Sequence, residues 1–435
     1  MRNLLIATFL LIGWVINAQT ILNIEDQTYT NNADTWLGVN ISRAKPTTFT
    51  FKNNSITSVN RNGYMLCAGD EVPGINNNNL AGEVITGNKF TWRGTDMTSI
   101  THGLFTGHNI NAVIKYNYLD GVPMGIIRKS GNNMSNTAGG IAYNIVKGGA
   151  VSVVVKGISN VRIYNNTFYT DRTTSQTGRP LIHIYTNSDN GGYSVSHGTK
   201  IYNNIFYTKY QTYSITVGDK ESLTGFECDY NVYWCGSGTP VFYVNGTKIT
   251  FAQWQAMGYD VHSVVVNPGF KDLINFVPAK RLDYGKNLGS EWEDGLSVYA
   301  RWGKSDPEKT AQNGTWQAGA VIYPENYVPG EKTTSGNQWT DTDSSLPGTG
   351  HYNPDFINLY PTPNDGRFTV SITSSLPAEF NRIAVICSTG QTVFNGSLGK
   401  DENIKQLDLS HLKRGFYTLL IIGGEIFFTK KFIKE

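Results

Sequence analysis

The chain has 435 residues, a formal net charge of +2 and only 16% charged residues, whereas glycine (46 residues) and tyrosine (24 residues) are abundant. This composition argues against a protein built from long charged helices and favours an all-β chain with many turns. Near-neutrality also excludes the strong overall positive field that would point to a nucleic-acid partner, so any useful charge must be local.

The N-terminus has the pattern of a cleavable signal peptide. Arg2 supplies a short positive segment, an apolar run covers residues 4–16, and small residues before Gln19 offer a cleavage site after Ala18. We expect residues 1–18 to be removed on export, with an N-terminal membrane anchor as the alternative. No other segment has the roughly 18 apolar residues of a membrane span. We therefore expect a mature protein that is secreted or held at the cell surface and has no membrane span.

An asparagine recurs through the first half of the chain, each time among apolar or aromatic residues, with a second β-rich run between copies. The copies are Asn54, Asn88, Asn117, Asn144, Asn166, Asn204 and Asn231, at intervals of 34, 29, 27, 22, 38 and 27 residues. Repeats of this length are typical of a β-solenoid, in which stacked rungs bury a continuous column and aligned asparagines form an amide ladder. We predict a right-handed parallel β-helix over about 25–270. A β-sandwich, with hairpin turns every ~8–12 residues, is the rival interpretation.

The rungs become irregular after the last repeated asparagine. The stretch "TFAQWQAMGYDVHS" has a short helical pattern that we expect to cap the open end of the coil, as terminal repeats require. The longer stretch "FAQWQAMGYDVHSVVVNPGF" resembles a segment near the C-terminal end of secreted carbohydrate-active β-helix proteins. We assign residues 19–326 to the β-helix domain with its cap. Within it, Cys228 and Cys235 could pair across a hairpin, or the cysteines could all be small buried hydrophobes.

The last fifth of the chain differs in kind. Residues 327–353 are rich in glycine, threonine, serine, aspartate and proline, which predicts a linker. Residues 354–435 contain short strands and turns that predict a small β-sandwich. This segment resembles the C-terminal sorting domain of the type IX secretion system, on the residues Leu359, Tyr360, Pro361, Pro363, Gly366, Leu407 to Leu412, Gly415, Tyr417 and the lysine-rich end. The resemblance implies the secretion machinery as a partner and no catalysis; a carbohydrate-binding sandwich is the alternative.

The middle of the coil is locally basic. Between Asn109 and Asn187, only Asp120 and Asp171 oppose a set of eight cationic residues. The set is Lys115, Arg128, Lys129, Lys147, Lys156, Arg162, Arg172 and Arg179. Because linear polymers can lie along the face of a solenoid, the basic strip favours an anionic polysaccharide as partner. A solvated face that only keeps the protein soluble would have the same composition.

Alignment of the second strands of successive rungs places Lys129 beside Lys156. His108 falls one rung earlier, and His183 and Tyr185 fall one rung later. We expect these three residues to bind substrate, together with Lys115 and Arg179. The sequence does not fix the side-chain register of Arg128 and Lys129, since a bulge would let both face solvent.

Cleavage of a uronate polymer by β-elimination requires a base for the proton beside the carboxylate, a cation that neutralises the carboxylate, and an acid for the leaving oxygen. A lysine among other cations suits the role of base, and an arginine suits neutralisation. We predict Lys129 as the base, with Arg128 and Lys156 neutralising the carboxylate and a tyrosine or histidine as the acid.

The stretch "KSGNNMSNTAGGIAYN" and the later "VVVKGISNVRIYNN" resemble the polysaccharide lyase family that contains chondroitinase B and many alginate lyases. The resemblance implies Lys129 as the base, and Lys156 falls near the family's second basic residue, where the family has arginine followed by histidine. The family's calcium-binding acids would precede the lysine, where this chain has Val122, Pro123 and Met124. We therefore expect no cofactor, with calcium as the open possibility.

Two other functions remain open. A glycoside hydrolase on the same scaffold would need carboxylates on one face. Those available are Asp70, Glu71, Asp96, Asp189, Asp219, Glu221 and Asp229, none of which repeats at rung spacing within the basic strip. A non-catalytic glycan-binding surface protein would use the basic strip without turnover. The leading prediction is a secreted lyase acting on alginate first and glycosaminoglycan second.

Overall fold

The computed structural model describes residues 21–31, 37–40, 48–59, 62–69, 82–94, 100–107, 111–172, 179–189, 193–271, 273–302, 306–324, 357–360, 364–372, 380–387, 392–399, 404–423 and 426–435. The expected signal peptide at 1–18, the expected linker at 327–353 and His108 lie outside these residues. The chain divides into two compact units, Met1–Asn326 and Tyr327–Glu435. None of the described helices is long and apolar enough to cross a membrane.

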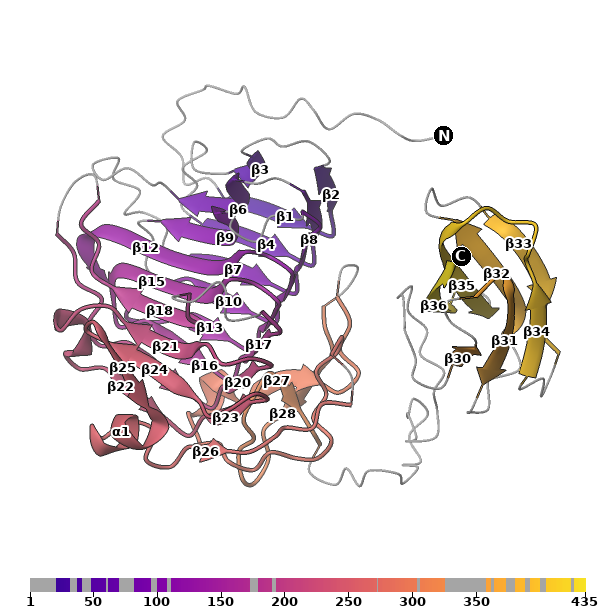
Figure 1. Cartoon of the computed structure of the whole chain (residues 1–435). Coiled ribbons are helices and arrows are strands. Elements are labelled where there is room, and N and C mark those ends of the chain that lie inside the picture. The colour runs from indigo at the N-terminus through magenta and orange to yellow at the C-terminus, as the bar shows by residue number, and fades with distance from the viewer. Residues whose placement is uncertain are drawn as a thin grey trace. The chain divides into compact units, whose positions relative to one another are not determined.

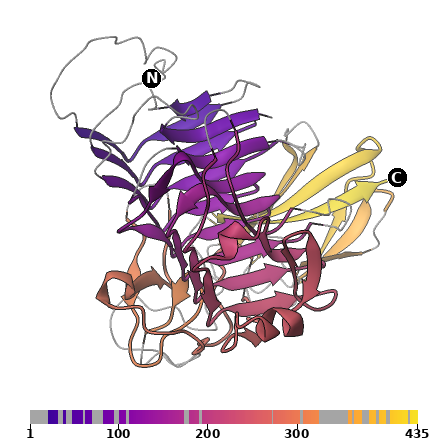
Figure 2. The same cartoon turned by 90° about the vertical axis from the view of Figure 1, so that its left-hand side faces the viewer.

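The first unit is a parallel β-helix, because strands β1 to β26 of its described part form three sheets and successive turns of the chain add one strand to each (Figures 1 and 2). Sheet A contains β1 (Ile21–Glu25), β4 (Thr48–Lys52), β7 (Gly82–Thr86), β10 (Val113–Lys115), β13 (Gly140–Ala142), β16 (Arg162–Tyr164), β19 (Lys200–Tyr202) and β22 (Glu227–Asp229). Sheet B contains β2 (Thr28–Asn31), β5 (Ser55–Ser58), β8 (Lys89–Trp92), β11 (Tyr118–Asp120), β14 (Ile145–Lys147), β17 (Thr167–Thr170), β20 (Ile205–Thr208), β23 (Val232–Cys235) and β26 (Val264–Val265). Sheet C contains β3 (Leu37–Asn40), β6 (Asn62–Gly69), β9 (Ile100–Gly107), β12 (Met124–Ser135), β15 (Val151–Ser159), β18 (Ile182–Tyr185), β21 (Tyr213–Val217), β24 (Val241–Val244) and β25 (Thr247–Thr250).

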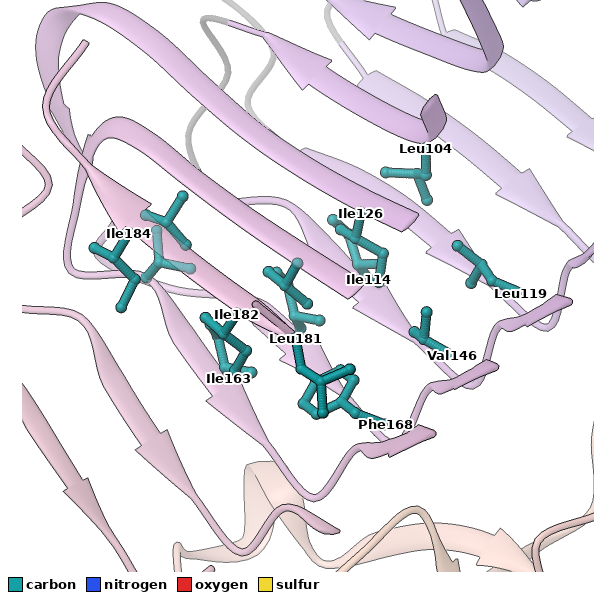
Figure 3. Close-up of a cluster of buried hydrophobic side chains, with 14 of the residues drawn as sticks. Leu104, Ile114, Leu119, Ile126, Val146, Ile163, Phe168, Leu181, Ile182 and Ile184 are labelled. Atoms are coloured by element: carbon teal, nitrogen blue, oxygen red, sulfur yellow. The ribbon is translucent and has the colours of Figure 1, made fainter. Parts of the chain in front are cut away.

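Apolar side chains from all three sheets fill the coil. Figure 3 shows Ile114, Leu119 and Ile126, from sheets A, B and C respectively, pointing into one core. Successive side chains of a strand point to opposite faces, so each rung contributes alternate residues to this column and leaves the others outside. The column buries apolar surface that no single rung could bury, which explains why the repeat folds only as a stack.

The recurring asparagines form the predicted ladder at the turn between sheets A and B. Asn144 shows the pattern: its side-chain amide donates to Asn166 Oδ1 at 2.9 Å and its own Oδ1 accepts from the amide of Asn117 at 2.9 Å. The same amide also donates to the backbone carbonyl of Ile114 at 2.8 Å. Equivalent bonds link the copies from Asn54 to Asn231. Because the amides are buried and each is hydrogen-bonded, the ladder replaces the water that an isolated turn would need.

A buried carboxylate ends the ladder. Asp260 accepts hydrogen bonds from Asn231 Nδ2 at 2.9 Å, Tyr233 OH at 2.7 Å and Trp254 Nε1 at 2.6 Å. Trp254 belongs to the predicted short helix, α1 (Phe251–Ala256), and stacks on Phe242 with the ring centroids 4.7 Å apart. This tryptophan is fully buried and closes the apolar column at its C-terminal end.

The chain then continues over the outside of the coil, and residues of this segment pack with buried tyrosines from sheet A and its turns. Figure 1 shows the backbone of the segment in orange beside the coil. The covering elements are η3 (Ser290–Trp292), β27 (Asp294–Ser297), β28 (Lys309–Ala311) and β29 (Val321–Ile322). Trp292 packs edge-on against Tyr164 with the centroids 4.9 Å apart, and its carbonyl accepts a hydrogen bond from Tyr143. This outer layer was not predicted from the sequence.

Cys228 and Cys235 do not pair. Both are buried free thiols, and Cys228 Sγ donates to Asp260 Oδ2 at 3.1 Å. The two residues lie on β22 and β23, which belong to different sheets, so they do not face each other across a hairpin. The possible disulfide is therefore corrected to separate buried thiols.

The second unit contains antiparallel sheets only, as far as the structure describes it. One sheet is formed by β30 (Ile357–Tyr360), β31 (Arg367–Ile372) and β34 (Ile404–Asp408), and the other by β32 (Phe380–Cys387), β33 (Thr392–Ser397), β35 (Gly415–Gly423) and β36 (Ile426–Lys434). Val370 from the first sheet and Ile383, Ile421 and Phe432 from the second share one core, so the two sheets form a sandwich.

Candidate functional site

The outer face of sheet C holds most of the residues singled out in the sequence. Lys129 on β12 is in register with Lys156 on β15, which is in register with Tyr185 on β18. Ile126 and Val155 point into the core of the coil. Lys129 and Lys156 are an odd number of positions away on the same strands, so their side chains point outward. The predicted neighbour relation between Lys129 and Lys156 is confirmed, and we call these residues the lysine pair.

One carboxylate joins the lysine pair. Asp189 Oδ2 lies 3.3 Å from Lys129 Nζ and forms an ion pair and a hydrogen bond with Lys156 Nζ. The side chains of the two lysines are each 15% exposed, whereas that of Asp189 is 45% exposed. The neighbouring ammonium groups, Lys156 first, lower the pKa of Asp189. The lysine pair is thus a binding site for a carboxylate, occupied here by a side chain of the same chain.

Asp189 reaches this position on a loop that follows β18. Asn187 at the start of the loop donates from Nδ2 to the carbonyl of Ser130 at 2.6 Å and forms a β-bridge with Ser194. Ser194 Oγ donates to the carbonyl of Gly157 at 2.6 Å. The residues on either side of Asp189 are therefore fastened to β12 and β15, and the exposed carboxylate extends over the lysine pair.

His183 and Tyr185 adjoin the lysine pair on the next strand. Their ring centroids are 4.3 Å apart, and Lys156 Nζ lies 5.2 Å from the centre of the Tyr185 ring. Burial lowers the pKa of His183 to about 4, with Asp219 opposing and Lys156 adding to the effect. Burial, with a contribution from Asp189, raises the pKa of Tyr185 to about 12. At neutral pH the site therefore combines an uncharged imidazole, a protonated phenol and two ammonium groups.

His102 is a further histidine on the outer face of sheet C. Its ring lies 4.9 Å from that of Tyr64 and 6.0 Å from that of Phe105, and its Nδ1 has no hydrogen-bond partner among the described residues. Burial, with a smaller effect of Lys129, lowers the pKa of His102 to about 4. Like His183, it is uncharged at neutral pH.

Arg128 does not belong to this face, which corrects the expected role in neutralising a substrate carboxylate. Its side chain is 3% exposed and lies inside the coil. Nη1 donates to Thr106 Oγ1 at 2.6 Å and lies 3.9 Å from Glu83 Oε2, while Nη2 donates to Asn136 Oδ1 at 3.0 Å. Burial lowers the pKa of Arg128 to about 10, with Glu83 opposing the shift. A guanidinium held in this way cannot reach a polymer.

Lys115 and Arg179 are also away from the lysine pair. Lys115 lies on sheet A, where its Nζ donates to the carbonyl of Glu291 at 2.8 Å and lies 4.3 Å from the centre of the Trp292 ring. Arg179 precedes β18 and lies close enough to Arg172 to contribute, after burial, to lowering the pKa of Arg172 to about 10. Lys115 is a packing residue of the outer layer, which corrects its expected role in substrate binding.

Asp189 is the residue whose part in the site the sequence did not indicate. The basic region defined by the sequence ends at Asn187, two positions before Asp189, which the sequence suggests only as a possible hydrolase carboxylate. The available signal is an acid four positions after Tyr185. No cluster of three or more histidine, cysteine or acidic side chains suited to a metal occurs among the described residues. Val122, Pro123 and Met124, where the lyase family has its calcium-binding acids, offer no carboxylate.

A family model assigns the second unit. Residues 358–435 match the secretion system C-terminal sorting domain. This segment is therefore a type IX secretion sorting domain, as its resemblance implied, and it indicates export to the cell surface or the medium. Comparisons of the chain with curated proteins and with solved structures found no match.

Proposed function

We propose that the β-helix unit is an exported lyase that binds a uronate-containing polysaccharide at the lysine pair and cleaves it by β-elimination. Alginate is the first candidate substrate and a glycosaminoglycan the second. The observation that supports this most directly is the convergence of two ammonium groups on one carboxylate oxygen of Asp189. A uronate carboxylate that replaced Asp189 would meet the same two charges.

Displacement of Asp189 is feasible because its side chain is 45% exposed. Because Asp189 itself is exposed, water can solvate its carboxylate once it leaves the lysines, so the ion pair is weaker than a fully buried one would be. A polymer that also contacts neighbouring side chains can therefore compete with Asp189. The lysine pair would then neutralise the uronate carboxylate and stabilise the negative charge that develops when the adjacent proton leaves.

The neighbouring rings supply the proton transfers. An uncharged His183 can accept the proton from the carbon that bears the carboxylate, because its lowered pKa leaves a nitrogen lone pair available at neutral pH. The electron pair of that bond forms a carbon–carbon double bond, and the bond to the glycosidic oxygen on the next carbon breaks. Tyr185, which keeps its proton at neutral pH, can donate to the departing oxygen.

This assignment moves the role of base from Lys129, where the sequence suggested it, to His183. Lys129 faces the carboxylate of Asp189, and substrate binding would only replace that carboxylate by another, so Lys129 is placed to neutralise the carboxylate rather than to reach the proton beside it. The contacts support elimination more than hydrolysis, since Asp189 pairs with the lysines and Asp219 accepts from the backbone amides of Thr186 at 2.6 Å and Ser222 at 2.9 Å. Neither carboxylate has the unengaged position that a hydrolase acid–base pair requires.

The test is incubation of the purified protein with alginate, pectate, chondroitin and dermatan, read by ultraviolet absorbance of the unsaturated product and by reducing ends together. We expect both signals with one polymer. Lys129→Ala and His183→Ala should each lower kcat/KM by about 10²–10³-fold, the range found when one transition-state contact is removed. Lys280→Ala, an exposed lysine far along the chain, serves as the matched control.

Each alternative has its own result. Reducing ends without the ultraviolet signal would replace elimination by hydrolysis. Retention of the polymer without chain shortening, lost in Lys129→Ala, would leave a glycan-binding protein. Full product formation by Lys129→Ala would disprove the role of the lysine pair.

A further inference from the structure

The outer face of sheet C continues past His183 towards the C-terminal end of the coil. His183 is in register with Thr216 on β21, and Thr216 with Tyr243 on β24. Thr216 is 6% exposed, and its Oγ1 has no hydrogen-bond partner among the described residues. A buried hydroxyl without a hydrogen-bond partner costs about 1–3 kcal/mol. Thr216 lies in register between His183 and Tyr243, so a polar ligand group bound here would give its hydroxyl the missing partner.

Two tyrosine rings lie together at this end of the face: Tyr243, which is in register with Thr216, and Tyr213, which precedes Thr216 on β21. The rings of Tyr213 and Tyr243 lie 5.1 Å apart on the same face, and both side chains are half-buried. Aromatic rings with one accessible side pack against the apolar faces of ligands, and their hydroxyl groups remain available for hydrogen bonds. The pair is therefore suited to a sugar ring.

A third lysine lies beside these rings. Lys248 on the antiparallel strand β25 is directly opposite Tyr243. Its Nζ donates to Gln211 Oε1 at 3.3 Å, and no carboxylate among the described residues pairs with it. The amide oxygen orients this ammonium group without neutralising it, in contrast to the lysine pair, where Asp189 supplies an opposing charge.

The strand order fixes how these features are arranged. Sheet C runs β12, β15, β18, β21, β24 and β25, so Lys156 and Lys248 are four strands apart, or about 19 Å at the usual ~4.8 Å strand spacing. Figure 1 shows these strands stacked one after another along the coil. Between the two lysines the face presents Tyr185, His183, Thr216 and Tyr243.

We infer that Tyr213, Thr216, Tyr243 and Lys248 form a second saccharide subsite, and that an anionic polysaccharide lies along the coil axis with one carboxylate at the lysine pair and another at Lys248. This inference rests on the proposed function for the lysine pair. It adds the direction of the ligand and the requirement that the ligand span the four strands between Lys156 and Lys248. Asp219, the acidic residue next to this face, is held by hydrogen bonds from the backbone amides of Thr186 and Ser222, so its carboxylate is oriented by the chain itself.

The inference predicts that affinity depends on ligand length. Fluorescently labelled alginate oligosaccharides from disaccharide to octasaccharide are titrated by anisotropy, read before any ultraviolet product signal develops. We expect the long oligosaccharides to bind the wild type about tenfold more tightly than the short ones, since they reach both subsites. Lys248→Ala and Tyr243→Phe test the charge and the hydroxyl of the second subsite, and Lys280→Ala is the control.

Lys248→Ala should remove most of the gain with length and leave disaccharide affinity within about twofold, because a disaccharide at the lysine pair is too short to reach Lys248, four strands away. Tyr243→Phe should remove a smaller part of the gain. Affinity that does not depend on length, or an equal loss for short and long oligosaccharides in Lys248→Ala, would overturn the second subsite.

Failure of the proposed function gives a different pattern. If Lys129→Ala and Lys156→Ala bind the disaccharide as tightly as the wild type, the lysine pair is not the carboxylate site. The length dependence and its loss in Lys248→Ala would be measured independently of that result.

Discussion

Sheets A and C each present an outward column that contains lysine and tyrosine, yet the two columns have different surroundings. On sheet A the register aligns Lys115, Ala142, Tyr164 and Tyr202, and on sheet C it aligns Lys129, Lys156 and Tyr185. The residues from β27 to β29 and η3 cover the first column, where the Tyr202 hydroxyl donates to Glu227 at 2.7 Å and the Lys115 ammonium donates to a carbonyl.

The column on sheet C is only partly covered, and its polar atoms are engaged differently. Asp189, which pairs with both lysines, is itself exposed, and the nearby His102 Nδ1 and Thr216 Oγ1 have no partner among the described residues. Residue type therefore does not distinguish a packing lysine from a ligand-binding one. The distinction lies in whether the protein itself satisfies the polar group permanently or by a contact that a ligand can replace.

The largest expected effect comes from uncovering the column on sheet A. Trp292 is 3% exposed and contacts both Lys115 and Tyr164, so Trp292→Ala removes a buried indole from the outer layer. We expect the free energy of unfolding of the β-helix unit to fall by about 3–5 kcal/mol, as for other buried aromatic truncations. Denaturant titration followed by circular dichroism measures the loss. Oligosaccharide affinity at sheet C should stay unchanged, and a loss of less than about 1 kcal/mol would show that the cover contributes little.

A smaller effect is the dependence of stability on pH that His102, on the outer face of sheet C, should cause. The folded-state pKa of His102 is about 4 against a reference of 6.5, so below pH 6.5 the unfolded chain takes up a proton that the folded chain does not. Stability should therefore fall as the pH drops from about 6.5 to about 4, and then cease to depend on this group. We expect a contribution of about 2 kcal/mol, reduced from the full shift because the ring is not completely buried.

The measurement compares the wild type with His102→Gln by chemical denaturation at several pH values. Carboxylates titrate in both proteins, so only the difference in slope reports the histidine. Parallel curves for the two proteins would contradict an uncharged His102 in the folded state. The same comparison with His183→Gln should give a similar difference, because burial lowers the pKa of His183 to about 4 as well.

The smallest expected effect on stability comes from two matched substitutions, one in the column on each sheet. Lys115→Met keeps most of the buried stem but removes the ammonium that contacts Trp292 and Glu291, so we expect a loss of about 1 kcal/mol of stability and full turnover. Lys156→Met should leave stability within about 0.5 kcal/mol and abolish most polymer cleavage or binding. Equal effects of the two substitutions on either measurement would remove the distinction between the columns.

Much of the fold followed from patterns that depend on local spacing. The asparagines from Asn54 to Asn231 predicted the rungs because a buried amide needs hydrogen-bond partners, and its equivalents in adjacent rungs supply them. The short helix α1 followed from its apolar pattern and begins with a capping box on Thr250. The outer layer over sheet A gave no such signal, since its strands are short and irregular.

The site was predictable only in part. The register of Lys129 with Lys156 followed from the repeat, whereas the orientation of Arg128 did not, because alternation can be interrupted by a bulge. Strand β12 has two such irregularities. Its register with β15 shifts after Lys129. Gly125 and Ile126 also face the core in succession, and a Cβ on Gly125 would lie 3.1 Å from the Val146 side chain. Pairing of Arg128 with Glu83 also depends on contacts between rungs that sequence distance conceals.

The order of residues along the chain was enough to predict the β-helix, the neighbour relation of Lys129 and Lys156, and the sorting domain at the C-terminus. These features depend on repeat length, alternation and sequence motifs. Which cations are accessible depends instead on the folded arrangement. Arg128 is inside the coil, Lys115 is beneath Trp292, and Lys129 and Lys156 share Asp189, because burial and partner choice arise from segments that meet only after the coil has closed.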